Sequence, residues 1–139
     1  MPPSGNFIIK GDNKHIVGIC AGSGVTPILS MIKTVLAQDS DNKFTLIYGN
    51  KTKDSSMFAA ELLQLQENNS DRFKIHNAYS REGVSGAING RLDKNTIQQL
   101  LNTFMPIKTA DAYFICGPGE LIDNANELLL LNNINQAKI

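Results

Sequence analysis

A glycine-rich stretch with the sequence Gly22-Ser23-Gly24-Val25-Thr26-Pro27 has the residue types of an anion site. Its two glycines let the backbone come close to a ligand, because neither carries a side chain that would hold the ligand away. We expect Thr26 to be the N-cap of a helix and Pro27 its first residue, where a missing N–H costs nothing. Free N–H groups at such a helix start attract phosphate. The hypothesis is a cradle for the phosphates of a dinucleotide. The alternative is a plain tight turn, since Pro27 replaces the third glycine of the GxGxxG fingerprint.

A second turn, Cys116-Gly117-Pro118-Gly119, follows another apolar run. Cys116 is small and polarisable, so it could pack against a flat ring without blocking it. No histidine or lysine lies close in the sequence to activate its thiol, so a nucleophilic role is unsupported. The alternative is an inert buried cysteine at the end of a strand.

Two arginine-containing segments, Ser80-Arg81-Glu82 and Gly90-Arg91, could hold a phosphate through guanidinium and hydroxyl donors. The alternative is a solvated loop. An ordinary dinucleotide-binding fold has an acidic residue after its second strand, where it binds the ribose hydroxyls. This chain has Gly49-Asn50-Lys51 there, so the ribose must be recognised differently.

Four apolar runs predict the strands that position these turns, and helices with one buried face separate the strands. Two of the runs are apolar on both faces, which is typical of central parallel strands. The chain therefore predicts an α/β fold with a three-layer, doubly wound, Rossmann-like parallel sheet. We expect about five strands in the order 3-2-1-4-5, with the fifth truncated. Both glycine turns then open into the crevice between the first and fourth strands, the topological switch point.

The expected strands are His15–Cys20, Phe44–Tyr48, a half-exposed Phe73–Tyr79, Ala112–Cys116 and the start of one at Ile134–Ile139; a glycine-rich loop is expected at Ser80–Gly90, and the expected helices are Pro27–Gln38, Ser56–Asn68 with Ser55 or Ser56 as cap, one capped by Asp93 and ending near Thr103, and Glu120–Leu131.

The composition is that of an ordinary globular domain: 139 residues, 42% hydrophobic and 19% charged, with thirteen basic and thirteen acidic side chains. The charge balance argues against a nucleic-acid or membrane partner. Two cysteines without metal-ligand spacing predict no metal site and fit a cytoplasmic protein. The chain has no Ser/His/Asp set, so a hydrolase has little support.

Taken in order, these segments resemble the NAD(P)-binding domain of the ferredoxin–NADP reductase superfamily. The matching segments are Ala21–Pro27, Leu46-Ile47-Tyr48-Gly49-Asn50, Ser80-Arg81-Glu82 with Gly90-Arg91, and Tyr113-Phe114-Ile115-Cys116-Gly117-Pro118. The most similar branch is the oxygenase-reductase type, which includes the NAD(P)H oxidoreductases of phenylacetate degradation. The chain departs from the family pattern at Leu121, where the family often has a methionine.

The resemblance implies roles for individual residues. Gly22, Ser23 and Gly24 would approach the pyrophosphate, with Val25 and Pro27 completing that turn. Thr26 would lie near the nicotinamide, and Cys116 beside its C4 atom, in a pocket shaped by Gly117, Pro118 and Gly119. Ser80, Arg81 and Arg91 would read the adenosine end, near Gly49 and Asn50, and Arg81 favours NADPH over NADH.

The resemblance also implies a larger protein. Residues 1–14 would be a linker from a flavin-binding domain, and residues 15–139 the NAD(P)-binding domain. Hydride would pass from NADPH or NADH to FAD, and electrons then to a 2Fe-2S centre on a ferredoxin-like domain and to an oxygenase component. The alternatives are the reductase domain of a flavohaemoglobin or of another electron-transfer flavoenzyme, and a non-catalytic α/β binding module.

Overall fold

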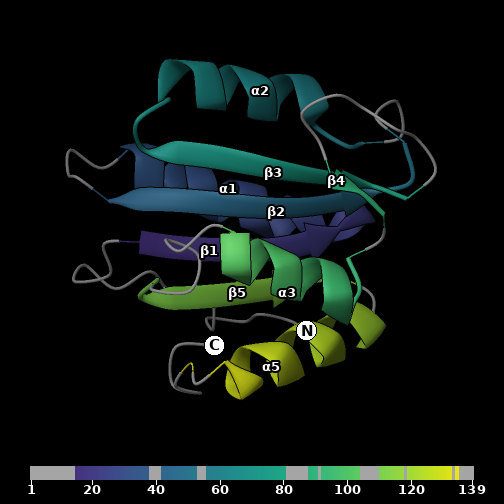
Figure 1. The fold of residues 1–139 in the computed structure, drawn as a ribbon. Helices are drawn as coiled ribbons and strands as arrows, with labels where there is room; N and C mark the ends of the chain where they lie inside the picture. The colour runs from purple at the N-terminus through teal and green to yellow at the C-terminus, as the bar shows by residue number, and fades with distance from the viewer. Residues whose placement is uncertain are drawn as a thin grey trace.

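The computed structural model describes residues 15–37, 42–52, 56–80, 88–90, 92–103, 110–117, 119–132 and 134. The four longer strands alternate with helices along this part of the chain, as expected (Figure 1). The strands are β1 (His15–Ala21), β2 (Lys43–Asn50), β3 (Phe73–Tyr79), β4 (Ile88–Asn89) and β5 (Ala112–Cys116); the helices are α1 (Val25–Ala37), α2 (Ala59–Asn68), α3 (Lys94–Thr103) and α5 (Gly119–Leu131), and a 3-10 turn, η1 (Gly22–Gly24), precedes α1.

The strands form one parallel sheet in the order β4-β3-β2-β1-β5. The order of the four longer strands confirms the doubly wound arrangement expected from the apolar runs. β1 lies between β2 and β5, and its residue Cys20 is in register with Cys116 of β5. Both strands therefore end at the same level, and their following turns leave the sheet side by side.

Each face of the sheet carries its own hydrophobic core, because successive side chains of a strand point to opposite faces. Ile16 and Cys20 of β1 pack with α1 and α2, whereas Val17 and Ile19 pack with α3 and α5. Gly18 keeps α1 close, since a Cβ atom there would lie 2.9 Å from Cγ2 of Ile28. This double burial explains why β1 is apolar on both faces.

The start of α1 differs from the expectation. The helix begins at Val25, directly after η1, so Thr26 is an exposed residue of its first turn and not its N-cap. Val25 is fully buried in the core beneath α1. Its burial draws the chain into the helix earlier than the capping pattern of Thr26 and Pro27 predicts.

The start of α2 also differs. Its N-cap is Phe58, which has a left-handed backbone with φ 58°. The prediction that Ser56 caps this helix is therefore wrong. The hydroxyl of Ser56 donates instead to the carbonyl of Thr52 at 3.2 Å. Ser55 lies outside the described residues.

Two further differences concern the edges of the sheet. The expected loop Ser80–Gly90 contains the short strand β4, which pairs with Ala78 and Tyr79 of β3. Of the expected fifth strand only Ile134 is described, and it is buried. Among the described residues, no helix is long and apolar enough to cross a membrane.

Candidate functional site: a cleft at the carboxyl ends of the strands

The two glycine turns touch each other through their backbones. A Cβ atom on Gly24 would lie 2.6 Å from the carbonyl oxygen of Cys116 and 2.9 Å from Cα of Gly117. Real Cβ atoms do not approach this closely, so only glycine permits the contact at position 24. The turns that follow β1 and β5 therefore meet backbone to backbone, at the crevice that the sequence predicts between these strands.

Gly22 has the opposite surroundings. Its φ of +57° favours glycine, and a Cβ atom there would meet nothing within 4 Å. The first N–H groups of a helix have no partner within the helix. The backbone thus borders open space at Gly22, directly before the start of α1, and a helix start of this kind can bind a phosphate group.

The side chain of Tyr48 contacts this turn through its hydroxyl group. Its ring is buried at the end of β2, and its hydroxyl lies 3.4 Å from the carbonyl oxygen of Gly22 and 3.1 Å from that of Met57. One hydroxyl therefore connects the glycine turn to the chain that enters α2. Burial raises the pKa of Tyr48, so the hydroxyl keeps its proton and remains a donor.

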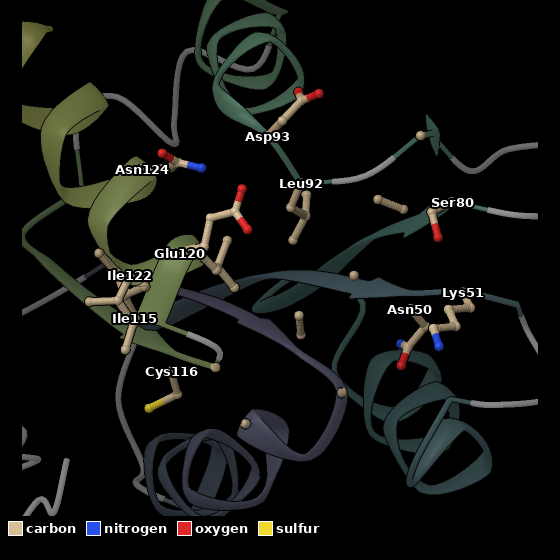
Figure 2. A pocket seen from close by; sticks show the side chains of 18 of the residues that line it. Asn50, Lys51, Ser80, Leu92, Asp93, Ile115, Cys116, Glu120, Ile122 and Asn124 are labelled. Carbon is tan, nitrogen blue, oxygen red and sulfur yellow. The ribbon is translucent and has the colours of Figure 1, made fainter.

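A cleft of about 1230 Å³ lies over the carboxyl ends of β1, β2, β3 and β5 (Figure 2). This volume exceeds the roughly 300–1,000 Å³ of most small-molecule pockets. The residues that line the cleft at the strand ends include Ala21, Gly49 and Ala78, whose small side chains fill little of its volume. An elongated ligand of dinucleotide size can therefore lie across the sheet.

Most of the predicted site residues that are described line this cleft. They are Gly22, Gly24, Pro27, Gly49, Asn50, Ser80, Cys116 and Gly117. Of the others, Val25 is buried, and neither Thr26 nor Gly119 is among the lining residues. Arg81, Arg91, Pro118 and the side chain of Ser23 lie outside what the structure describes.

Cys116 is half-buried and packs against the core beneath α1. Burial raises the pKa of its thiol, and burial raises the pKa of the neighbouring Cys20 even further. Both thiols are free and neutral at physiological pH. This agrees with the sequence-based interpretation that a nucleophilic role of Cys116 is unsupported.

The polar wall of the cleft was not predicted from the sequence. Asp93, Glu120 and Asn124 line it from α3 and α5, and Lys51 lines it after β2. Asp93 also caps α3, as predicted, because its Oδ1 accepts from the N–H of Thr96 at 2.9 Å. A signal was present for Glu120, which lies in the first helical turn after the second glycine turn.

Comparisons with known proteins agree with this geometry. The family described as "Oxidoreductase NAD-binding domain" matches residues 19–127. One component of the 1,2-phenylacetyl-CoA epoxidase from Escherichia coli is 35% identical over 93% of this chain and 37% of its own length. The ferredoxin reductase component of 3-ketosteroid-9-alpha-monooxygenase from Rhodococcus rhodochrous is 31% identical over 100% of this chain and 36% of its own length.

Among solved structures, the flavohem-like FAD/NAD-binding domain of nitric oxide dioxygenase from Vibrio cholerae superimposes with a TM-score of 0.80. The match covers 96% of this chain and 52% of that one, at 21% identity, which establishes the shared fold. The chain spans little more than a third of the length of the two curated relatives it matches.

Proposed function

Because this chain belongs to the family of oxidoreductase NAD-binding domains, we propose that it binds NADPH or NADH across the strand ends and positions the nicotinamide for hydride transfer. The observation that carries this proposal is the backbone contact between Gly24 and Cys116–Gly117. The contact brings Gly22, where a Cβ atom would meet nothing within 4 Å, and Cys116 into the lining of one cleft.

The roles of the residues follow the order of the strands. Gly22, Ser23 and Gly24 hold the pyrophosphate over β1, where the backbone can approach it. Cys116 and Thr26 flank the nicotinamide, and a neutral Cys116 thiol can touch the ring without attacking it. Ser80, Arg81 and Arg91 hold the adenosine end over β3. The chain thus contributes binding and orientation.

Bound NAD(P)H would supply a hydride to FAD on a neighbouring domain, and the electrons would pass to a 2Fe-2S centre and an oxygenase component. In this proposal residues 1–14 link the chain to the flavin-binding domain, and 15–139 are the nucleotide domain. The similarity to the 1,2-phenylacetyl-CoA epoxidase component supports an oxygenase in phenylacetate degradation. The two free thiols fit the reducing cytoplasm.

We favour NADPH over NADH. Arg81 follows Ser80 in the sequence, and a guanidinium can pair with a 2′-phosphate. Lys51 supports the same choice, because it lines the cleft after β2, where a carboxylate would select the unphosphorylated ribose. If Arg81→Ala binds 2′,5′-ADP as tightly as the native chain does, this preference is wrong.

The binding proposal is tested by titrating the chain with NADPH, NADH and 2′,5′-ADP while recording amide NMR spectra. We expect NADPH to shift the amide signals of Gly22, Gly24 and Cys116, and 2′,5′-ADP to shift those near Ser80. If the amide signals of all four residues stay unchanged when the ligands are added, the proposal is refuted and a non-catalytic binding module is favoured. The coding sequence on either side of this chain would distinguish the proposed electron acceptors. Iron–sulfur cysteines after Ile139 would fit the oxygenase type, and a globin before Met1 would fit a flavohaemoglobin.

A further inference from the structure

The wall of the cleft formed by α5 has polar side chains to which the proposed function assigns no role. Glu120 and Asn124 are one helical turn apart, and both line the cleft. In Figure 2 the carboxylate of Glu120 projects into the cleft, and Asn124 lies near it on the same helix. Side chains at i and i+4 share one face of a helix, so the two can act on the same ligand group.

The position of Glu120 is set by its neighbours in the turn. Gly117 has φ +150°, and a Cβ atom there would lie 3.1 Å from Cδ2 of Leu121. Leu121 is buried in the core beneath α5, so the first turn of the helix is anchored from inside. Glu120 is the exposed residue beside this anchor. Its carboxylate makes no hydrogen bond or ion pair within the described part of the chain.

The charges of the cleft are separated. Among the described lining residues, the only basic side chain is Lys51, at the end of β2, whereas the carboxylates of Asp93 and Glu120 are on the α3 and α5 side (Figure 2). Asp93 is engaged with the N–H of Thr96. Phosphate groups are attracted toward Lys51 and repelled from Glu120. A ligand group beside Glu120 is therefore not anionic, and it should be able to donate hydrogen bonds to the carboxylate.

A dinucleotide has one such group at the right place along its length. From its phosphorylated adenosine end it continues through the pyrophosphate to a ribose with two free hydroxyls, and then to the nicotinamide. With the pyrophosphate at Gly22 and the nicotinamide at Cys116, that ribose would lie between them, on the β1–β5 side of the cleft that α5 also lines. A carboxylate can accept from both hydroxyls of a diol, and the Asn124 amide can donate or accept.

We propose that Glu120 and Asn124 bind the diol of the nicotinamide-side ribose, an inference that rests on the proposed nucleotide function. The pair replaces, at the other end of the ligand, the acidic residue that is missing after β2. It also fixes the direction of the dinucleotide, because the charged adenosine end is excluded from the acidic wall.

The test compares a ligand that contains this ribose with one that lacks it. NADPH has the nicotinamide-side diol, whereas 2′,5′-ADP has only the adenosine half. We expect Glu120→Ala to weaken NADPH binding about 10-fold, as for a lost hydrogen bond to a charged group, and to leave 2′,5′-ADP within about 2-fold of the native chain. Glu120→Gln keeps one acceptor and should lose less. NADPH, but not 2′,5′-ADP, should shift the amide signal of Asn124.

The control is Asp123→Asn, which removes one charge from an exposed residue of the same helix outside the cleft. It should change neither affinity by more than about 2-fold, since exposed charges act weakly over distance. If the Glu120 variants bind both ligands more tightly, the carboxylate only repels phosphate and the proposal is wrong. Unchanged NADPH affinity also overturns it. A native chain that binds neither ligand contradicts the nucleotide function itself.

Discussion

The contact between the two glycine turns makes Gly24 the position where one added methyl group should do most damage. In Gly24→Ala the new Cβ atom would lie 2.6 Å from the oxygen and 2.7 Å from the carbon of the Cys116 carbonyl group. Non-bonded carbon contacts are normally about 3.5–4.0 Å long. The turns must therefore separate by roughly 1 Å, and both sides of the contact are backbone, which cannot rotate away.

The expected loss follows from that geometry. Overpacking a tight site costs about 1–3 kcal/mol, and an immovable neighbour places Gly24→Ala at the upper end, about 3 kcal/mol. Gly22→Ala meets no atom within 4 Å but must adopt φ +57°, which costs about 1–2 kcal/mol. Gly119→Ala has neither a clash nor a positive φ, so it should be neutral or stabilising by up to about 1 kcal/mol.

Urea unfolding followed by far-UV circular dichroism measures the three free energies of unfolding under identical conditions. The expected order of stability is Gly119→Ala, then Gly22→Ala, then Gly24→Ala. All three exchanges add the same methyl group, so differences reflect the site. If Gly24→Ala is as stable as Gly22→Ala, the turns do not touch in solution, and the backbone contact that carries the proposed function is absent.

Three further predictions concern single side chains. Tyr48→Phe should lower the free energy of unfolding by about 1 kcal/mol in urea unfolding, since its hydroxyl donates to backbone carbonyls; an unchanged value would contradict that bond. Iodoacetamide should label Cys116 slowly and Cys20 only after unfolding, as read by mass spectrometry, because burial raises the pKa of both thiols and covers Cys20; equal native labelling would contradict this. Burial lowers the pKa of His76, so the unfolded chain binds the proton more tightly and stability should fall as pH drops below about 6.5. Urea unfolding of His76→Gln should show a smaller fall, and an identical pH profile would count against this assignment.

The sequence alone was sufficient for the order of the long strands. The runs His15–Cys20 and Ala112–Cys116 are apolar on both faces, and this pattern predicted that they are central, adjacent strands. They are neighbours, and β5 is the outermost described strand on its side of the sheet. The helix cap at Asp93 was equally local, since one side chain and an N–H three residues later decide it. The strands are predictable from their local apolar runs, and the cap is predictable because the residues that form it are close in the sequence.

The helix starts were not predictable in this way. Thr26 has the right type for a cap, but buried Val25 extends α1 past it. Just before α2, the Tyr48 hydroxyl donates a hydrogen bond to the Met57 carbonyl. The next residue, Phe58, has a left-handed backbone that no local sequence pattern indicates. Tertiary packing outweighs local preference here, because a capping bond contributes only about 1 kcal/mol.

The two glycine turns show both what the sequence predicts and what only the tertiary structure determines. Their residue types, Gly22-Ser23-Gly24 and Cys116-Gly117, are enough to predict two turns that open into one crevice. Only the tertiary structure shows that Gly24 touches the Cys116 carbonyl while Gly22 faces open space. It alone also shows that Glu120 lines the same cleft. The residue types within each segment are enough to predict the turns. The distance between segments that are far apart in the sequence depends on the β1–β5 register and on the packing of Leu121, which bring them together.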